Sequence, residues 1–176
     1  MKILILYATT EGQTRKIAEF ITKELKGDDV TLVDAADTHP KPGPQGFAGA
    51  ILAASLHAHK YQRSILTYAR DHHAALNQIP SLFISISLSA AGDDPRDLKG
   101  IADCAEEFKA ETGWSPAKVL QVAGAFRFTK YDFFKGWVMR MIAKSKGVKV
   151  DAHEDLELTN WKTLAADIAA FRSSLA

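Results

Sequence analysis

Residues 1–20 read MKILILYATTEGQTRKIAEF, and this stretch decides the fold. Ile3 to Tyr7 form a continuous apolar run, which is typical of a central parallel strand covered on both faces. Apolar residues at helical spacing then run from Gln13 to Leu25. The short polar segment between them, ATTEGQT (residues 8–14), carries three threonines and one glycine but no lysine. A strand that leads so directly into a helix predicts an α/β unit.

The same alternation continues along the chain and predicts a three-layer α/β sandwich around a five-stranded parallel sheet, joined by right-handed crossovers. Residues 126–158 interrupt it and form an insertion before the last helix, so that residues 1–176 make one domain. Gly113 is the expected cap that ends the third helix, and Thr159 or Asn160 is expected to begin the last one. The further strands are expected at Val30–Val33, Ala48–Ala54, Leu82–Leu88 and Val119–Ala125, and the further helices at Tyr61–Leu76, Asp97–Thr112 and Thr159–Leu175.

The composition favours a globular protein. Of 176 residues, 47% are hydrophobic and 24% are charged, and the formal net charge is +1, which gives no overall signal for nucleic-acid binding. Cys104 is the only cysteine, so the chain forms no internal disulfide and carries no CxxC pair. The apolar start is too short for a signal peptide, and no apolar run approaches the ~20 residues that span a bilayer. We therefore expect a cytoplasmic protein, with peripheral contact to the membrane as an added expectation.

The loop at residues 8–14 follows the carboxyl end of a strand, which is where open parallel sheets bind their ligands. The helix that follows offers unpaired N–H groups and the positive end of its dipole, which suit a phosphate. A P-loop would need GxxxxGK[ST], and a dinucleotide site would need GxGxxG; the loop has neither. A hydroxyl-rich site for a monophosphate remains, with a simple N-capping turn as the alternative.

The segment ILYATTEGQTRKIA (residues 5–18) resembles the phosphate-binding loop of the flavodoxin family, which binds FMN. The sequence is most similar to one branch, the menaquinone-dependent protoporphyrinogen oxidases. The likeness extends over AASLHAHKYQ, IPSLFISISLS, VAGAFRFTKYDFF and LTNW. It implies a flavodoxin-like fold and an enzyme of haem biosynthesis. Such an enzyme oxidises protoporphyrinogen IX to protoporphyrin IX through FMN and passes the electrons to a membrane quinone.

The resemblance also implies which residues bind the flavin. The loop after the first strand would hold the phosphate, and the loops after the third and fourth strands would flank the ring. Related enzymes read ASIRYGHY where this chain reads ASLHAHKY, which leaves His57 as the aromatic candidate in that loop. The implied FMN-binding residues are Thr9, Thr10, Glu11, Gly12, Gln13, Thr14, Ser55, Leu56, His57, Tyr61, Ser87, Leu88, Ser89 and Ala90.

Two further readings concern histidine and cysteine. His57 and His59 are two residues apart, but two ligands do not close a metal site, so no metal is expected. Both histidines are expected to be loop residues near solvent. Cys104 falls within a helical pattern and is expected to be a small buried residue.

The segment FRFTKYDFFKGWVMRMIAKSKGVKV (residues 126–150) combines seven cations with one acid, Asp132. Its apolar residues follow i, i+3, i+4, i+7, i+8, which predicts an amphipathic helix. The stripe either packs on the domain core or contacts a membrane or quinone, with residues 130–149 as the candidate membrane contact. Resemblance to the family makes Arg127 and Lys130 the first candidates to bind the substrate's propionates. The stripe consists of Phe134, Trp137, Val138, Met141 and Ile142.

Three other functions stay open. A flavodoxin-type electron carrier is one, although such carriers are usually strongly acidic. An FMN-dependent quinone reductase that uses NAD(P)H is another. The third is a phosphate-binding module without a flavin. No catalytic side chain is expected in the favoured enzyme, because the flavin carries the redox chemistry.

Overall fold

The computed structural model describes residues 1–126 and 156–175. Five parallel strands form one sheet in the order β2-β1-β3-β4-β5. All residues of β3 and β4 are buried, including the three serines of β4, as expected for central strands of a parallel sheet that is covered on both faces. The predicted five-stranded parallel sheet is confirmed. The strands are β1 (Lys2–Ala8), β2 (Asp29–Asp34), β3 (Gly49–Ser55), β4 (Ser81–Ser87) and β5 (Lys118–Ala123).

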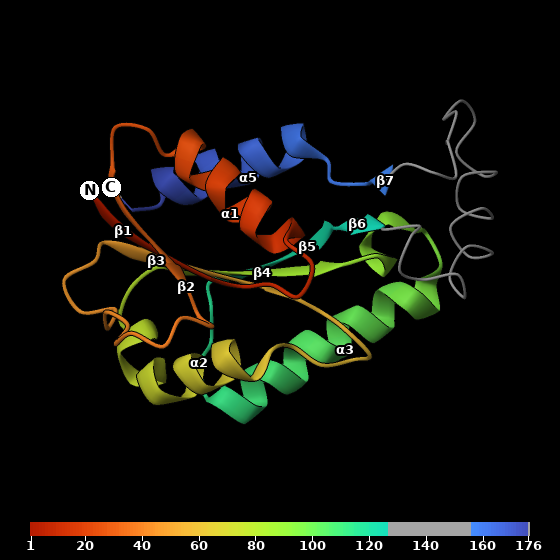
Figure 1. Cartoon of the computed structure of the whole chain (residues 1–176), viewed down its shortest axis with the longest axis horizontal. Coiled ribbons are helices and arrows are strands. Elements are labelled where there is room, and N and C mark those ends of the chain that lie inside the picture. Colours follow the sequence, from red (N-terminus) through yellow and green to blue (C-terminus); the bar gives the residue numbers. More distant parts are fainter. Residues whose placement is uncertain (127–155, 176) are drawn as a thin grey trace.

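Helices cover both faces of this sheet and complete the three predicted layers. In Figure 1, α1 and α5 lie on one face, and α2 and α3 lie on the other. Successive residues of β1 alternate between the two cores: Ile3 and Ile5 pack with α1 and α5, whereas Leu4 and Leu6 pack with α2 and α3. The helices are α1 (Gln13–Glu24), α2 (Arg63–Leu76), α3 (Pro95–Thr112) and α5 (Trp161–Ser173), and a single 3₁₀ turn, η1 (Ser89–Ala91), follows β4.

The helix ends follow local capping rules. Gly113 adopts φ +74° just after α3 and donates its N–H to the Lys109 carbonyl at 2.9 Å, which confirms it as the predicted cap. At the start of α5, the Asn160 side chain accepts a hydrogen bond from the Thr163 N–H at 3.0 Å. Asn160 is therefore the cap, and Thr159 has a different role.

The predicted insertion begins and ends in a small antiparallel pair. Strand β6 (Ala125–Phe126) pairs with β7 (Leu156–Glu157), so the two ends of the insertion lie side by side (Figure 1). Residues 127–155 lie outside the described part of the chain. The expectations for Arg127, Lys130 and the apolar stripe at residues 134–142 fall there.

The order of the strands predicts where a ligand binds. The chain runs from β1 outward to β2, and then returns to place β3 on the other side of β1. The loops after β1 and β3 therefore leave the sheet in opposite directions and open a crevice at its carboxyl edge. The loop at residues 9–12 lies at this switch point.

Candidate functional site

The loop between β1 and α1 is a compact turn that exposes the start of a helix. Gly12 adopts φ +94°, a left-handed conformation that strongly favours glycine, and its N–H donates to Thr9 Oγ1 at 2.9 Å. Lys16 is the first residue of α1 whose N–H donates a backbone hydrogen bond, which goes to the Gly12 carbonyl at 3.1 Å. The N–H groups of residues 13–15 thus have no acceptor within the helix. Among the described residues, no side chain caps them.

Thr14 is the most informative residue of this loop. It is fully buried, and its Oγ1 has no hydrogen-bond partner anywhere in residues 1–126 and 156–175. A buried hydroxyl without a partner is unfavourable by about 1–3 kcal/mol. It stands beside the unpaired N–H groups at the start of α1. Both features favour a ligand rich in acceptor oxygens at this point.

A cavity of about 560 Å³ opens next to Thr14. Its walls come from the loops after β1, β3 and β4, from the first turns of α3, and from the segment after β5. Most of the site residues implied by the sequence are brought together here. Those that line the cavity are Thr9, Glu11, Gln13, Thr14, Ser55, Leu56, His57, Ser87, Leu88 and Ser89.

Four implied residues do not line this cavity. Thr10, Gly12 and Ala90 belong to its loops, and Gly12 and Ala90 shape them through backbone hydrogen bonds to Thr9 Oγ1 and Ser87 Oγ. Tyr61 is not part of the cavity lining either, and its expected contact with the flavin ring stays a prediction.

Tyr61 is partly buried and packs against the hydrophobic core beneath α2 and α3. Its ring packs edge-on against Phe83 and Phe108, with ring centroids 5.1 Å apart in both cases. Its hydroxyl lies 2.8 Å from Ser85 Oγ, and burial raises the pKa of the phenol to about 12. Helical periodicity placed Tyr61 in α2, but α2 begins at Arg63. The side chain instead fills the space between α3 and the sheet.

The hydroxyl groups that face the cavity are arranged as hydrogen-bond donors. Thr9 Oγ1 accepts from Gly12 N–H, and Ser87 Oγ accepts from Ala90 N–H at 3.2 Å. An oxygen that accepts from the protein still has its own proton to donate. With the buried Thr14 hydroxyl, they form a donor-rich wall that suits phosphate and carbonyl oxygens.

The loop after β3 makes a tight two-residue turn. The N–H and C=O groups of His57 and Lys60 bond to each other at 2.9 Å in both directions, and the residues between them, Ala58 and His59, have φ of +46° and +62°. Such values are unfavourable for residues other than glycine. His59 Nδ1 lies 3.6 Å from the Sγ of Cys104, which holds the turn against α3.

His57, Ala58 and His59 all line the cavity, so this turn is one of its walls. Cys104 is buried as expected, and burial raises the pKa of its thiol, with the charges of Glu107 and Asp103 acting in the same direction. The thiol therefore stays protonated at neutral pH. Among the described residues, no group of three His, Cys, Asp or Glu side chains is arranged to hold a metal ion.

The sequence did not identify the wall made by α3. Arg96, Asp97, Gly100 and Ile101 all line the cavity. Gly100 was the available signal, because glycine inside a helix is unfavourable by about 0.5–1 kcal/mol relative to alanine. No described atom lies within 4 Å of the position where a Cβ would be at Gly100. The missing side chain leaves room in the cavity.

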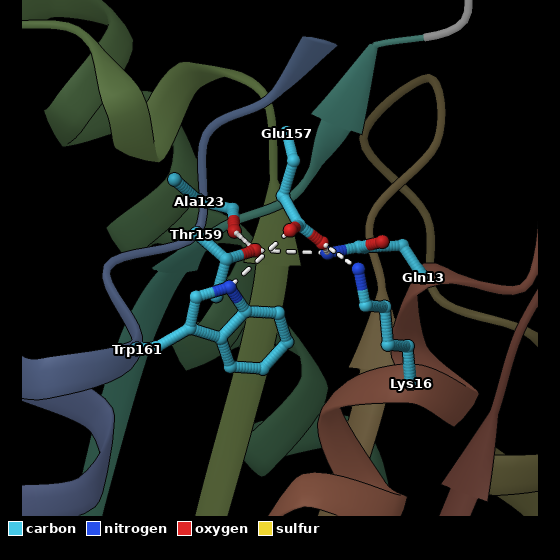
Figure 2. A network of polar contacts seen from close by, with 6 residues as sticks. All are labelled: Gln13, Lys16, Ala123, Glu157, Thr159 and Trp161. Atoms are coloured by element: carbon cyan, nitrogen blue, oxygen red, sulfur yellow. Dashed lines mark hydrogen bonds and ion pairs between the residues drawn. The ribbon is translucent and has the colours of Figure 1, made fainter. Parts of the chain in front are cut away.

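A polar network joins the start of α1 to the chain that follows the insertion (Figure 2). The Gln13 Nε2 donates to Glu157 Oε1 and to Thr159 Oγ1, both at 2.9 Å. Thr159 Oγ1 in turn donates to the Ala123 carbonyl at 2.7 Å. Both protons of the Gln13 amide are used here, so Gln13 can contribute a donor to a ligand only through its backbone N–H.

Glu157 is the centre of this network (Figure 2). Burial alone would raise the pKa of this carboxyl, but hydrogen bonds from Lys16, Gln13 and Trp161 outweigh burial and lower it. Lys16 Nζ lies 2.7 Å from Glu157 Oε1, and Trp161 Nε1 lies 3.3 Å from Glu157 Oε2. The carboxylate thus fixes the first turn of α1 beside the cavity.

The chain belongs to the flavodoxin domain family, whose model matches residues 4–153. Solved structures agree on the fold. Oxidised flavodoxin 1 from Bacillus cereus covers 100% of both chains with a TM-score of 0.60 at 16% identity. A Fusobacterium nucleatum flavodoxin bound to flavin mononucleotide covers 99% of this chain and 96% of its own, with a TM-score of 0.51 at 13% identity. The predicted flavodoxin-like fold is confirmed.

Sequence relatives are more specific than the structures. The chain is 29% identical over 167 residues to a protoporphyrinogen IX dehydrogenase [quinone] from Escherichia coli K12, covering 94% of this chain and 91% of that protein. It is 28% identical over 176 residues to the protein of the same name from Leishmania major, covering 96% of this chain and 75% of that protein. These relatives agree with the family branch indicated by the sequence.

Proposed function

We propose that this chain is an FMN-dependent oxidoreductase that converts protoporphyrinogen IX to protoporphyrin IX and passes the electrons to a quinone. The relatives from Escherichia coli and Leishmania major support the reaction, since both are named for it and both align along nearly the whole chain. The buried Thr14 hydroxyl at the start of α1, which has no partner in the described part of the chain, carries the assignment of the cofactor.

The residues of the cavity fit a flavin mononucleotide. A phosphate needs several hydrogen-bond donors. The first turn of α1 supplies unpaired N–H groups and contains no acidic residue. Thr14 and Thr9 add hydroxyl donors. Glu11, the one carboxylate of the loop, replaces a residue that is often threonine in flavodoxins, and it sits at the cavity wall.

The remaining walls suit a flat ring with a polar edge. Leu56 and the imidazole of His57 offer an apolar and an aromatic contact on one side, while Gly100 leaves an open surface on α3. Backbone groups in the loop after β4, at Leu88 and Ser89, lie at the same cavity and can serve the polar edge. When bound, FMN supplies the hydride and electron-transfer chemistry.

The chain's own residues would bind, orient and enclose the cofactor. Thr9, Thr14 and the N–H groups at the start of α1 would hold the phosphate end. The turn at residues 57–60 would set the position of the ring, because its backbone bonds and the Cys104 contact fix it against α3. Arg96, at the cavity wall, supplies a cation close to the site.

The partners beyond the flavin are proposed from the sequence. Arg127 and Lys130 remain the first candidates for the propionates of the substrate, and residues 130–149 remain the candidate contact with an anionic membrane surface. Both lie outside the described residues. No helix in the described part of the chain is long and apolar enough to cross a bilayer.

Two measurements test the proposal in order. Purified protein is expected to be yellow and to release FMN on denaturation; colourless protein that takes up no FMN would remove the cofactor assignment. Holoprotein is then mixed anaerobically with protoporphyrinogen IX and a soluble quinone, and porphyrin fluorescence is followed. A rate above the enzyme-free background is expected. Fluorescence no faster than that background, with FMN bound, would leave an electron carrier or a quinone reductase.

A matched control separates these alternatives. Electron transfer from NADPH to the same quinone is measured with the same holoprotein. We expect it to be slower than transfer from protoporphyrinogen IX, because none of the sequence motifs identifies a dinucleotide site. A faster reaction with NADPH would favour the quinone reductase.

A further inference from the structure

Gln62 lies outside every set of residues assigned so far, yet it joins two loops of the site. It immediately precedes α2 with φ −60° and ψ 139°, and its side chain makes no capping hydrogen bond to that helix. The side chain instead reaches toward the sheet. Its Nε2 donates to Thr10 Oγ1 at 2.9 Å and to Ser55 Oγ at 2.5 Å. Thr10 belongs to the loop after β1, and Ser55 ends β3.

The direction of these two bonds sets the role of both hydroxyls. A hydroxyl that accepts from an amide N–H keeps its proton for another acceptor. If the Gln62 amide were rotated by 180°, its Oε1 would accept hydrogen bonds from both hydroxyls. Thr10 and Ser55 could then offer a ligand only lone pairs. The observed orientation thus turns two hydroxyls into donors. It matches Thr9 and Ser87, whose oxygens also accept from the protein.

In this orientation of the Gln62 amide, the described part of the protein does not supply a hydrogen bond to the amide oxygen. Gln62 Oε1 is buried and has no hydrogen-bond partner within residues 1–126 and 156–175. Buried acceptors are normally paired. In the rotated amide, this oxygen would accept hydrogen bonds from the hydroxyls of Thr10 and Ser55. A ligand rich in acceptor oxygens would favour the observed orientation instead, because the two hydroxyls are then free to donate to the ligand.

We propose that Gln62 is a positioning residue that sets the hydroxyls of Thr10 and Ser55 as hydrogen-bond donors, with the Thr10 proton directed to a phosphomonoester. This inference rests on the proposed FMN site and deepens it. Thr10 does not itself line the cavity, but it lies between Thr9 and Glu11, which do, in the loop that leads to the uncapped start of α1. On that ground its donor is assigned to the phosphate end. Ser55 lines the cavity and belongs to the rest of the ligand.

The test compares FMN with riboflavin, which lacks the phosphate. Apoprotein is titrated with each flavin, and Kd is measured from the quenching of flavin fluorescence. In Gln62→Met the packing volume is kept, and the amide is lost. We expect the affinity for FMN to fall about 3- to 10-fold more than that for riboflavin, the usual range for one neutral hydrogen bond. In Gln62→Glu the carboxylate accepts hydrogen bonds from both hydroxyls, so neither can donate to the ligand. We expect the affinity for FMN to fall about 10- to 100-fold.

Two controls separate a positioning role from a structural one. Gln78→Glu places the same charge at an exposed site beyond the end of α2, and we expect both Kd values to equal those of the unchanged protein. Thr10→Val removes the hydroxyl through which Gln62 acts. In that background, Gln62→Met should cause no further change in the ratio of the two affinities, because residues that act through one contact are not additive.

Three outcomes would overturn the inference. An unchanged FMN affinity in Gln62→Met and Gln62→Glu would mean that the amide does not act on the ligand. An equal loss for FMN and riboflavin, with a lower melting temperature, would mean that Gln62 only ties the two loops together. Failure of the unchanged protein to bind FMN would remove the proposed function, and the inference with it.

Discussion

Replacement of Thr14 by valine is expected to weaken FMN binding and to stabilise the apoprotein at the same time. Valine has nearly the same shape as threonine and exchanges the hydroxyl for a methyl group. Thr14 is fully buried, and its Oγ1 has no partner among the described residues. The substitution therefore removes a hydroxyl that no described residue pairs with and that a ligand can pair with, and it leaves the packing almost unchanged.

The two magnitudes follow from the environment of this hydroxyl. A hydrogen bond to a charged group contributes about 1.5–3 kcal/mol, so Kd for FMN should rise about 10- to 150-fold. Without ligand, the unpaired hydroxyl is unfavourable by about 1–3 kcal/mol. Even the lower value should raise the melting temperature of apoprotein of this size by about 2–4 °C.

The assay combines flavin titration of the apoprotein with thermal unfolding in the absence of FMN. Thr14→Ser keeps the hydroxyl and should bind FMN within a few-fold of the unchanged protein. Thr112→Val is the matched control, because Thr112 is also buried, but its Oγ1 donates to the Phe108 carbonyl at 2.8 Å. That variant should lose about 1 kcal/mol of stability and keep its affinity for FMN.

An unchanged Kd in Thr14→Val would refute the position assigned to the phosphate. A lower melting temperature of the apoprotein would refute the second part of the reasoning, since it would mean that the hydroxyl has a partner in the folded chain. The Thr112 control excludes a general effect of replacing buried threonines.

Other predictions test the rest of the site. Tyr61→Phe should lower the free energy of unfolding by about 1–2 kcal/mol in denaturant titrations, because it leaves buried Ser85 unpaired, and FMN affinity should not change; a large loss of affinity would return Tyr61 to the flavin site. Glu157→Gln should lower the melting temperature at pH 7. Because the folded-state pKa of this carboxyl is lowered, its stabilisation is present above the ordinary value of 4.5 and is lost as pH falls through the folded pKa, so the two melting curves should converge in acid; a difference that persists there would contradict the assignment. Ala58→Gly should stabilise the apoprotein by about 0.5–1 kcal/mol by relieving a left-handed residue, whereas Ala166→Gly, in exposed helix, should cost about 1 kcal/mol; a loss at both positions would show that the turn is not strained.

Much of the site was accessible from local sequence patterns. The loop at residues 8–14 could be located because a buried strand, a glycine with positive φ and an amphipathic helix all leave short-range signals. The strands were predicted to within one or two residues for the same reason. Gly113 as a helix cap depends only on its neighbours, and the prediction was confirmed.

Contacts between distant residues could not be predicted in this way. The family resemblance assigned Tyr61 to the ring contact, but its partners in the fold, Ser85 and Phe108, are 24 and 47 residues away. The turn between His57 and Lys60 decides which neighbouring side chain enters the core. The local sequence does not predict this turn, since alanine and histidine, here Ala58 and His59, are not typical of left-handed conformations.

The sequence by itself determined the layers, the strand–helix units and the position of the loop that we propose binds the phosphate, because periodicity, glycine and capping act over a few residues. Only the tertiary structure decided which groups meet at the cavity. It joined Gln62 to Thr10 across 52 positions, left the buried Thr14 hydroxyl without a partner in residues 1–126 and 156–175, and made α3 a wall of the cavity. Hydrogen-bond pairing and burial depend on elements that come together only in the folded sheet, so these features have no local signature.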